Sequence, residues 1–405
     1  MGGSTEVGGG GRRLTRRLAG AAVAMAAVGL VATGCGSSSS NGGSASSGGG
    51  CSDLEIGVMG PMTGTFASYG TTALHAAQFK LKPFEAKNPK CHIKLVQFDS
   101  QGDPKQGPGL ARKAIANQKM VAILGPAFSG VTQAVTPILD AAGMPMITGT
   151  STNGELSQSG WKVFHRTVVN DSQEGPTEAK YIVNNLHLKR VAVVDNGQTY
   201  GKGLADLVRK ELKQLGGQVV DSESIDANGS DYSSTINRIR AANPQVVYCG
   251  CLDPEAARLV KQMRAAGDKT TFTGGAGLNT NQYLKEAGKA VNGSQVGSGG
   301  VDAQSTPEGK AWLASWKQMF NGPPDLYAVE WTNAAQALYN AIGSGHTTRE
   351  SIQQYLGTAS FPGAAGGTVG FTPQGDVKNG KLNWYMVKNQ QFELVNSIPL
   401  ITLGG

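Results

Sequence analysis

The chain has 405 residues, of which 58 are glycine, and its 36 Lys and Arg residues against 29 Asp and Glu residues give a net charge of +7. Hydrophobic residues make up 39% of the chain, and with glycine added this is close to the globular average, so disorder along the whole length is excluded. Apolar runs of about twenty residues are absent, which excludes a polytopic membrane protein. At about 100–200 residues per domain, the length predicts two domains.

Residues 1–34 have the features of an export signal. A cluster of four arginines between Arg12 and Arg17 precedes an apolar run from Leu18 to Val31, a pattern typical of a secretory signal peptide. The run is followed by Ala-Thr-Gly-Cys, which ends at Cys35 and resembles the lipobox of bacterial lipoproteins. We therefore expect residues 1–34 to be a lipoprotein signal peptide and Cys35 to be lipidated. An ordinary signal peptide with an unused cysteine, or a twin-arginine signal, is the alternative.

Residues 35–50 predict a tether between the lipidated cysteine and a folded body. The segment 36–50 contains only Gly, Ser, Asn and Ala, a composition that gives a flexible coil. We expect export to the outer face of the bacterial cytoplasmic membrane, with attachment through the lipid. Once residues 1–34 are removed, 32 basic and 28 acidic residues leave a net charge of +4. Nearly half of the positive charge of the full chain thus belongs to the export signal, and no nucleic-acid partner is predicted.

From residue 53 onward, short apolar runs alternate with helical patterns in two series. The first has strands near Leu54–Met59, Ile93–Phe98, Val121–Leu124 and Met146–Ile147, and helices near Thr71–Glu85, Gly107–Gln118 and Val131–Ala142. The second has strands near Val191–Val194, Val219–Val220 and Val246–Tyr248, and helices near Gly175–Asn185, Leu204–Leu215, Ser233–Ala242 and Pro254–Ala266. Strands alternating with helices indicate parallel sheets, so we expect an α/β fold with two doubly wound lobes.

The last third of the chain is less regular. Helices are expected near Pro307–Met319 and Tyr327–Ile342, and the glycine-rich tail Thr368–Leu394 is expected to form short strands. In doubly wound sheets, ligands bind at the carboxyl ends of the strands. The loops that follow the predicted strands are therefore where a functional site is expected.

Small hydroxyl side chains follow two of these strands. Ser129 precedes a helix, and a helix N-terminus with a hydroxyl suits an anion such as a carboxylate. Thr150 and Thr152 offer similar groups after the next strand. The structural alternative for Ser129 is a helix N-cap, and the alternative for Thr152 is a capping box with Glu155.

Signatures of catalysis are missing from the sequence. Neither a Walker loop nor a dinucleotide fingerprint is present, and the five histidines are scattered. Zinc is not expected, because no second Cys or His pair stands at ligand spacing. The sequence therefore predicts a protein that is not an enzyme and needs no cofactor or metal.

Four cysteines follow Cys35, and an exported protein is free to form disulfides. Cys51 and Cys91 each lie just before an apolar run, so they meet at one sheet edge if these runs are neighbouring parallel strands. We expect them to form a disulfide. Cys249 and Cys251 point to the same face of a strand at a separation near the limit for bridging. Two alternatives therefore stand for this pair: a second disulfide, or two reduced thiols.

From Leu54 to about Val395, the chain resembles the leucine/isoleucine/valine-binding proteins of bacterial ABC importers. The motifs that carry this resemblance are Ile56–Gly64 (IGVMGPMTG) with Tyr69-Gly70, Asp103–Gln106, Met146–Thr148, Gln173–Pro176, Tyr200–Leu204 and Arg264–Gly267. The resemblance implies two Rossmann-like lobes joined by three crossover segments, with the ligand between them. Lobe 1 would comprise 52–170 and 300–377, and lobe 2 would comprise 171–299 and 378–405.

The family pattern also assigns roles in the cleft. Ser129 and Thr152 would meet a ligand carboxylate, and Thr150 would lend a backbone contact. Tyr69 and Tyr200, each at the end of a glycine-rich loop, would flank the ligand from the two lobes.

Two positions depart from the amino-acid binders of this family. Leu252 stands where they carry a tyrosine, and Ala276 stands where they carry the glutamate that holds the ammonium. A buried ammonium without a carboxylate costs several kcal/mol. Either the ligand lacks an α-ammonium or Asp253 supplies the charge, although Asp253 before Pro254 is also typical of a helix N-cap. The pattern predicts a small carboxylate whose remainder is apolar or aromatic.

The resemblance implies a solute-binding protein that delivers its ligand to membrane permease subunits with their ATPases. One alternative is a sensor of the same fold that passes closure to a regulatory partner. Another is a hydrolase in which Ser129 is served by a distant base such as His75 or His165.

Overall fold

The computed structural model of the protein describes residues 51–401. The expected signal peptide, the lipidated Cys35 and the tether to residue 50 lie outside the described residues. Within 51–401, no helix is long and apolar enough to cross a membrane.

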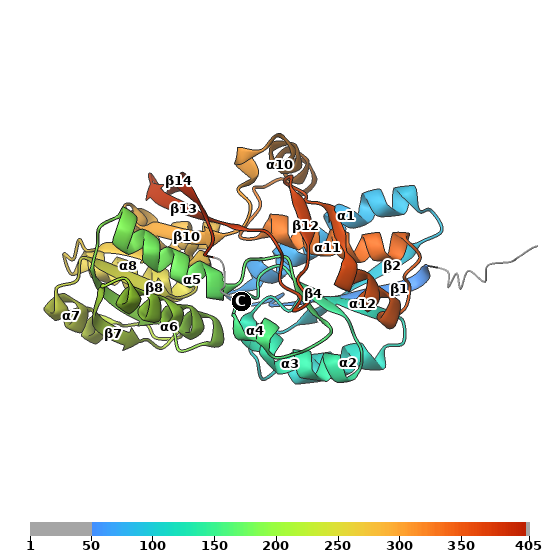
Figure 1. Ribbon diagram of the computed structural model, residues 1–405, viewed down its shortest axis with the longest axis horizontal. Helices are drawn as coiled ribbons and strands as arrows, with labels where there is room; N and C mark the ends of the chain where they lie inside the picture. Colours follow the sequence, from blue (N-terminus) through green and yellow to red (C-terminus); the bar gives the residue numbers. More distant parts are fainter. Residues whose placement is uncertain (1–50, 402–405) are drawn as a thin grey trace, which may run out of the picture. The chain divides into compact units, whose positions relative to one another are not determined.

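The first lobe is built on a five-stranded parallel sheet in the order β2-β1-β3-β4-β5. Figure 1 labels β1, β2 and β4 of this sheet. Its strands are β1 (Ser52–Gly60), β2 (His92–Asp99), β3 (Met120–Leu124), β4 (Met146–Thr148) and β5 (Phe164–Arg166). Its helices are α1 (Ala67–Lys87), α2 (Gly107–Ala116), α3 (Ser129–Ala141), α4 (Glu155–Gln158), α10 (Pro307–Phe320), α11 (Ala328–Gly343) and α12 (Arg349–Thr358). One apolar core packs α1 and α11 on one face of the sheet, and a second packs α2 and α3 on the other.

The second lobe has a seven-stranded sheet in the order β14-β13-β10-β9-β8-β6-β7. Its strands are β6 (Arg190–Asp195), β7 (Gln218–Ser224), β8 (Val246–Gly250), β9 (Thr271–Gly274), β10 (Gln295–Gly299), β13 (Lys381–Lys388) and β14 (Gln391–Pro399). Its main helices are α5 (Asp171–Lys180), α6 (Thr199–Gln214), α7 (Ser233–Ala242), α8 (Asp253–Ala265) and α9 (Asn281–Ala287). The cores on its two faces contain α5 with α6 and α7 with α8.

The chain passes between the sheets three times. It leaves β5 for α5, leaves β10 for a short 3₁₀ turn (Ala303–Ser305) before α10, and leaves the small hairpin of β11 (Ser360–Pro362) and β12 (Thr368–Gly370) for β13. The predicted architecture of two doubly wound lobes joined by three crossovers is confirmed.

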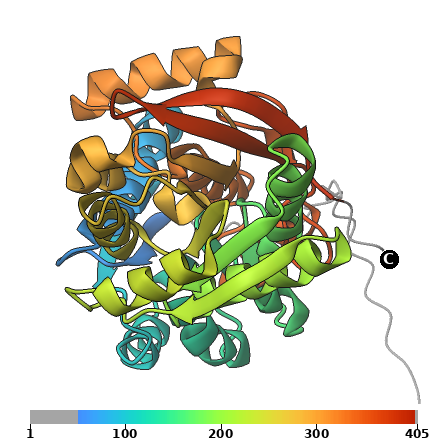
Figure 2. The same cartoon turned by 90° about the vertical axis from the view of Figure 1, so that its left-hand side faces the viewer.

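Two details of the predicted elements are wrong. The tail contains the short strand β12, as predicted, but most of it forms a long antiparallel hairpin, β13 with β14, seen in red in Figure 2. Helices α1 and α6 begin at Ala67 and Thr199, earlier than their apolar periodicity predicts, so Tyr69 and Tyr200 lie in first helical turns rather than in loops.

The expected disulfide between Cys51 and Cys91 is present. Cys249 and Cys251 also form a disulfide, with their Cα atoms 5.3 Å apart, which settles the alternative that the sequence left open.

Candidate functional site

A cavity of about 500 Å³ lies between the lobes, at the carboxyl ends of strands of both sheets. The residues that line it are Tyr69, Gln101, Gly102, Asp103, Pro104, Ala127, Phe128, Ser129, Gly130, Thr150, Thr152, Gly197, Gln198, Thr199, Tyr200, Asn228, Leu252, Ala276, Gly277, Leu326 and Tyr327. Seven of the eight residues expected at the ligand site therefore line one cavity, and Asp253 does not. The size falls within the usual range for small-molecule pockets.

The first turn of α3 faces this cavity. The helix begins at Ser129 after Phe128, whose side chain makes no capping bond, and the first N–H groups of a helix lack partners within it. Ser129 is thus not the N-cap, which corrects one alternative from the sequence. Its hydroxyl instead accepts the backbone N–H of Asn153 at 3.2 Å. Free N–H groups at the positive end of a helix are suited to an anionic oxygen.

The loop after β4 supplies the second wall of this polar corner. Thr148 Oγ1 donates to the carbonyl of Pro126 at 2.6 Å, and Thr150 Oγ1 donates to the carbonyl of Ala127 at 2.5 Å. These bonds fix the loop against the segment that leads into α3. The two expected carboxylate contacts therefore come from adjacent loops of one rigid sheet edge.

Thr152 is 1% exposed and its hydroxyl makes no hydrogen bond of normal geometry among the described residues. The expected capping box is absent, because α4 begins at Glu155 and the side chain of Asn153 accepts the Glu155 N–H at 2.9 Å. Burial raises the pKa of the neighbouring Asp171 carboxyl to about 7, and the Thr152 hydroxyl acts against this rise. A buried hydroxyl without a well-made bond has a free energy cost that a ligand can remove. Thr152 is therefore available to the cavity.

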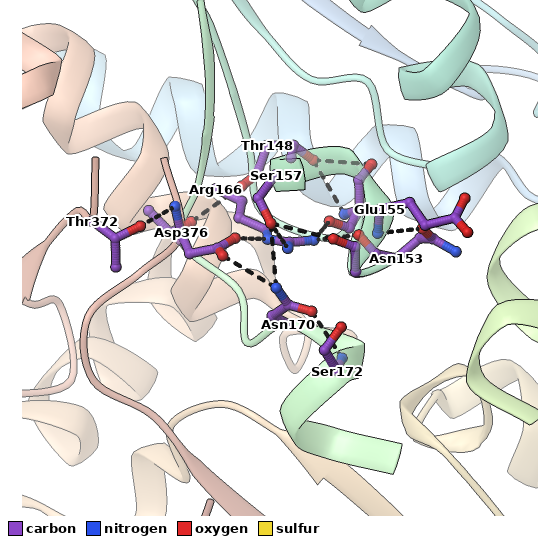
Figure 3. A network of polar contacts seen from close by, with 12 residues as sticks. Thr148, Asn153, Glu155, Ser157, Arg166, Asn170, Ser172, Thr372 and Asp376 are labelled. Atoms are coloured by element: carbon purple, nitrogen blue, oxygen red, sulfur yellow. Dashed lines mark hydrogen bonds and ion pairs between the residues drawn. The ribbon is translucent and has the colours of Figure 1, made fainter. Parts of the chain in front are cut away.

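Arg166, at the end of β5, holds this loop from behind (Figure 3). Its side chain is fully buried; Nη1 donates to the carbonyls of Ser151 and Asn153 at 3.0 and 2.9 Å, and Nε pairs with Asp376 at 2.6 Å. Asp376 lies in the third crossover segment. Arg166 was not expected at the site, although an arginine between the apolar pairs Val163-Phe164 and Val168-Val169 was a signal that a buried partner must exist.

Aromatic rings form much of the remaining wall. The rings of Tyr69 and Phe128 meet edge to face with centroids 5.0 Å apart, and Phe66 packs against both. From the other lobe, the hydroxyl of Tyr200 accepts the N–H of Gly277 at 3.0 Å. The sequence reasoning missed Phe128 because it belongs to no motif. A ligand here would meet flat apolar faces beside the polar corner.

Asp253 lies behind Tyr69. Its carboxylate accepts hydrogen bonds from the hydroxyls of Tyr69 and Thr280 at 3.3 and 3.1 Å, and burial raises its pKa to about 8. Helix α8 begins at Asp253, and the preceding Leu252 occupies the N-cap position, so Asp253 is not the N-cap. It joins the two lobes through Tyr69 and does not reach the cavity.

The charge around the cavity is sparse. Asp103 is the one charged side chain among the described lining residues, and no cation lines the cavity. Behind the lining residue Ala276, the fully buried Glu174 accepts the N–H groups of Ala276 and Gly299 at 3.3 and 2.9 Å. Burial, followed by the neighbouring Asp171 carboxylate, raises the pKa of Glu174.

Direct hydrogen bonds join the two lobes beside the cavity. Asn153 Nδ2 donates to the carbonyl of Thr199, a lining residue, at 2.9 Å, and Thr199 Oγ1 lies 3.4 Å from the side-chain oxygen of Gln133. The lobes are thus in direct contact next to the cavity.

The geometry offers no base for a serine nucleophile. His75 stacks on Phe320 with ring centroids 4.2 Å apart, and His165 packs edge to face against Phe371. The described residues that line the cavity include no histidine. Within 51–401, no group of His, Cys, Asp or Glu side chains could hold a metal ion.

Comparisons with known proteins agree with this geometry. The family model described as periplasmic binding protein matches residues 53–391. A Leu/Ile/Val-binding protein of Citrobacter freundii is 31% identical over 338 residues, which cover 82% of this chain and 91% of the relative. A leucine-binding protein, LivK, from Thermotoga maritima superposes with a TM-score of 0.78 at 26% identity, covering 85% of this chain and 99% of its own. A solute-binding protein of an ABC transporter from R. palustris, in complex with benzoate, gives a TM-score of 0.78 at 20% identity and covers 86% of this chain and 97% of its own.

These features define a two-lobed solute-binding protein with the type I periplasmic binding fold. The chain belongs to the periplasmic binding protein family and is similar to its leucine/isoleucine/valine-binding members. Family membership implies a location outside the cytoplasm, and the relatives are binding proteins rather than enzymes.

Proposed function

We propose that this protein is the lipid-anchored solute-binding component of an ABC importer, and that it captures a small carboxylate between its lobes. The loaded, closed form docks on membrane permease subunits, and their ATPases drive uptake. The observation that carries this proposal is the polar corner of the cavity, where the first turn of α3 and the hydroxyl of Thr152, which makes no hydrogen bond of normal geometry, face the same space.

The polar corner favours a carboxylate over a neutral group. Free N–H groups at a helix start and neutral hydroxyls stabilise an anion without a buried cation. Ser129 and Thr152 would take the carboxylate oxygens, and Thr150 would contribute through its backbone.

The remainder of the ligand would be apolar or aromatic. Tyr69, Tyr200 and Leu252 offer rings and a branched side chain to it. Ala276 brings no charge into the cavity, and the carboxylate of Asp253 is bonded to Tyr69 and Thr280. The half-buried Asp103 is the one lining carboxylate that could meet an ammonium, and its side chain already accepts the Lys105 N–H. A ligand without an α-ammonium fits the rest of this lining, because a buried ammonium needs a partner.

Titration calorimetry tests the ligand class. The purified protein is titrated with benzoate and 4-hydroxybenzoate, and with leucine, isoleucine and valine. We expect an aryl carboxylate to bind more tightly than any of the three amino acids. Tight binding of valine would contradict the absence of an α-ammonium while leaving the carboxylate corner intact. Benzyl alcohol, which keeps the ring but lacks the carboxylate, is the control and should not bind.

The lipid anchor needs its own test. In bacteria grown with radiolabelled palmitate, the parent chain should carry label and sediment with membranes. Cys35→Ala should lose the label and appear in the soluble exported fraction. Label on the alanine variant would contradict Cys35 as the lipidation site.

A further inference from the structure

A disulfide lies at the end of β8 beside the cavity, and neither its position nor its role follows from the proposed function. Cys249 is in β8, Cys251 follows its end, and both are buried. The next residue, Leu252, lines the cavity. The bridge thus closes a ring around the single residue Gly250.

This bridge shortens the end of the strand. Two residues of extended chain advance about 6.4–6.8 Å, whereas the Cα atoms of Cys249 and Cys251 are 5.3 Å apart. The chain is therefore not fully extended across Gly250, where β8 ends. It turns, and Leu252 becomes the residue before α8 and enters the cavity wall.

The residue between the two bridged cysteines packs on the opposite face of β8. Both bridged cysteines pack in the core that contains α7 and α8. Gly250 alternates to the other face, where it lies so close to the carbonyl of Gly201 that no Cβ would fit. Gly201 follows Tyr200 in the first turn of α6. The bridge is thus next in the chain to the cavity residue Leu252. Through the contact of Gly250 with Gly201, it also lies against the helical turn that carries the cavity residue Tyr200.

The turn after β8 also packs against Gly277, another residue of the cavity lining. The carbonyl of Cys251 leaves no room for a Cβ on Gly277, and a Cβ there would also lie 3.3 Å from Leu252 Cδ2. Gly277 in turn donates its N–H to the hydroxyl of Tyr200 at 3.0 Å. The turn after β8 therefore contacts the segments that form the lobe-2 wall beside it.

We propose that the Cys249–Cys251 disulfide is a positioning element of the ligand site, which holds Leu252 and the first turn of α6 in their binding geometry. The inference rests on the proposed function for its ligand readout. A wall that is already in its binding geometry loses less conformational freedom when the ligand binds, and its affinity is correspondingly higher.

The chain offers a matched control in its other disulfide. Cys51 and Cys91 are 40 residues apart in the sequence, and neither lines the cavity. In the loop-entropy description, a long closed loop stabilises the fold more than a short one. Cys51→Ala/Cys91→Ala should therefore lower the Tm more than Cys249→Ala/Cys251→Ala does.

Ligand affinity, unlike the Tm, should fall more in Cys249→Ala/Cys251→Ala than in Cys51→Ala/Cys91→Ala. By calorimetry, with whichever of benzoate, 4-hydroxybenzoate and leucine binds the parent best, Cys249→Ala/Cys251→Ala should bind at least about 10-fold more weakly. The Cys51→Ala/Cys91→Ala variant should bind like the parent. Equal affinity of parent and Cys249→Ala/Cys251→Ala would overturn the proposal. If that variant does not fold, Cys249→Val/Cys251→Ala, which keeps the strand side chain large, takes its place.

A double-mutant comparison separates positioning from general stability. Leu252→Ala should weaken binding in the parent and should have a clearly smaller effect once the disulfide is removed, because the two changes act on one wall. Additive effects would overturn a role through Leu252.

A readout without ligand keeps this inference distinct from the proposed function. Hydrogen exchange at the amides of residues 199–201 and 250–255 should be faster in Cys249→Ala/Cys251→Ala than in Cys51→Ala/Cys91→Ala. Equal protection would overturn the positioning role even if no tested carboxylate binds. Failure of all the tested carboxylates to bind the parent, together with faster exchange, would instead count against the proposed ligand class alone.

Discussion

At the scale of single residues, the clearest feature of the cavity is the buried hydroxyl of Thr152, which makes no hydrogen bond of normal geometry and has the Asp171 carboxyl as its neighbour. Thr152→Val removes this hydroxyl and keeps the shape of the side chain. We expect the Tm to change little, whereas carboxylate affinity falls about 10- to 100-fold, corresponding to the ~1.5–3 kcal/mol of a hydrogen bond to a charged group. Calorimetry and thermal melts measure both.

Thr136→Val is the matched control for this prediction. Thr136 lies in α3, and its hydroxyl donates to the backbone of Thr132, away from the cavity lining. Its replacement should leave affinity unchanged. Unchanged affinity in Thr152→Val as well would remove Thr152 from the ligand site.

The raised pKa of the buried Glu174 carboxyl predicts that the free energy of unfolding depends on pH. Its carboxyl titrates near 4.5 when unperturbed, and burial raises its pKa to about 8 in the folded chain. Between these values the folded chain holds a proton that the unfolded chain releases, so the free energy of unfolding falls as the pH rises from about 5 to 8. Glu174→Gln should reduce this slope in urea unfolding measured across that range, and the raised pKa values of Asp171 and Asp253 should maintain the rest of it.

The exposed Glu350 in α12 is the control for Glu174. Glu350→Gln should keep the slope of the parent. A slope in Glu174→Gln equal to that of the parent would mean that Glu174 is ionised in the folded chain throughout this range.

At the scale of elements, Arg166 ties the cavity loop after β4 to the third crossover. Asp376→Ala leaves the fully buried guanidinium without its carboxylate, and removing one partner of a buried pair costs about 3–5 kcal/mol. We expect that loss in urea unfolding. Ligand affinity should also fall, because Arg166 positions the carbonyls of Ser151 and Asn153 beside Thr152.

Glu393→Ala breaks an exposed pair with Lys388 in the β13–β14 hairpin and serves as the comparison. Exposed pairs add little because water screens them, so its stability should stay close to that of the parent. Similar losses in the two variants would show that burial of Arg166 is not the cause.

Elements with regular periodicity could be predicted from the sequence, and those shaped by a partner could not. The alternation of apolar runs and helical patterns predicted strands β1–β4 and β6–β8, but it missed β5, β9 and β10. Strand β10 (Gln295–Gly299) has no apolar run. Two of its residues are glycines because Glu178 and Glu174 pack directly against Gly297 and Gly299. The strand is dictated by side chains more than a hundred residues earlier, which no local pattern contains.

The residues of the candidate site also divide into those that the sequence predicts and those that it does not. Ser129 and Thr152 were predictable because they follow strands in doubly wound lobes. Phe128 and Tyr327 were not, since one precedes a helix without a capping group and the other adopts a left-handed conformation with φ 58°. Their place in the cavity depends on how the loops fold over one another.

At the scale of the whole molecule, the proposed capture of a ligand between the lobes requires them to separate and close. The hydrogen bond from Asn153 to Thr199 and the contact of Thr199 with Gln133 join the lobes beside the cavity. A ligand that touches both lobes stabilises the closed state only by its higher affinity for that state. The fraction of closed molecules without ligand is therefore the quantity that sets the apparent affinity.

A pair of cysteines across the contact between the lobes would measure that fraction. A Cβ on Gly130 would lie 3.7 Å from Thr199 Cβ, within the range of about 3.5–4.5 Å found in disulfides. In Gly130→Cys/Thr199→Cys, oxidation should therefore link the lobes only when they are closed. We expect the linking rate to rise on addition of the carboxylate that binds the parent best, and the ratio of rates without and with saturating ligand gives the closed fraction of the free protein. Thr199→Cys alone, which cannot form the link, is the control. Equal rates with and without ligand would show that binding does not shift the lobes toward closure.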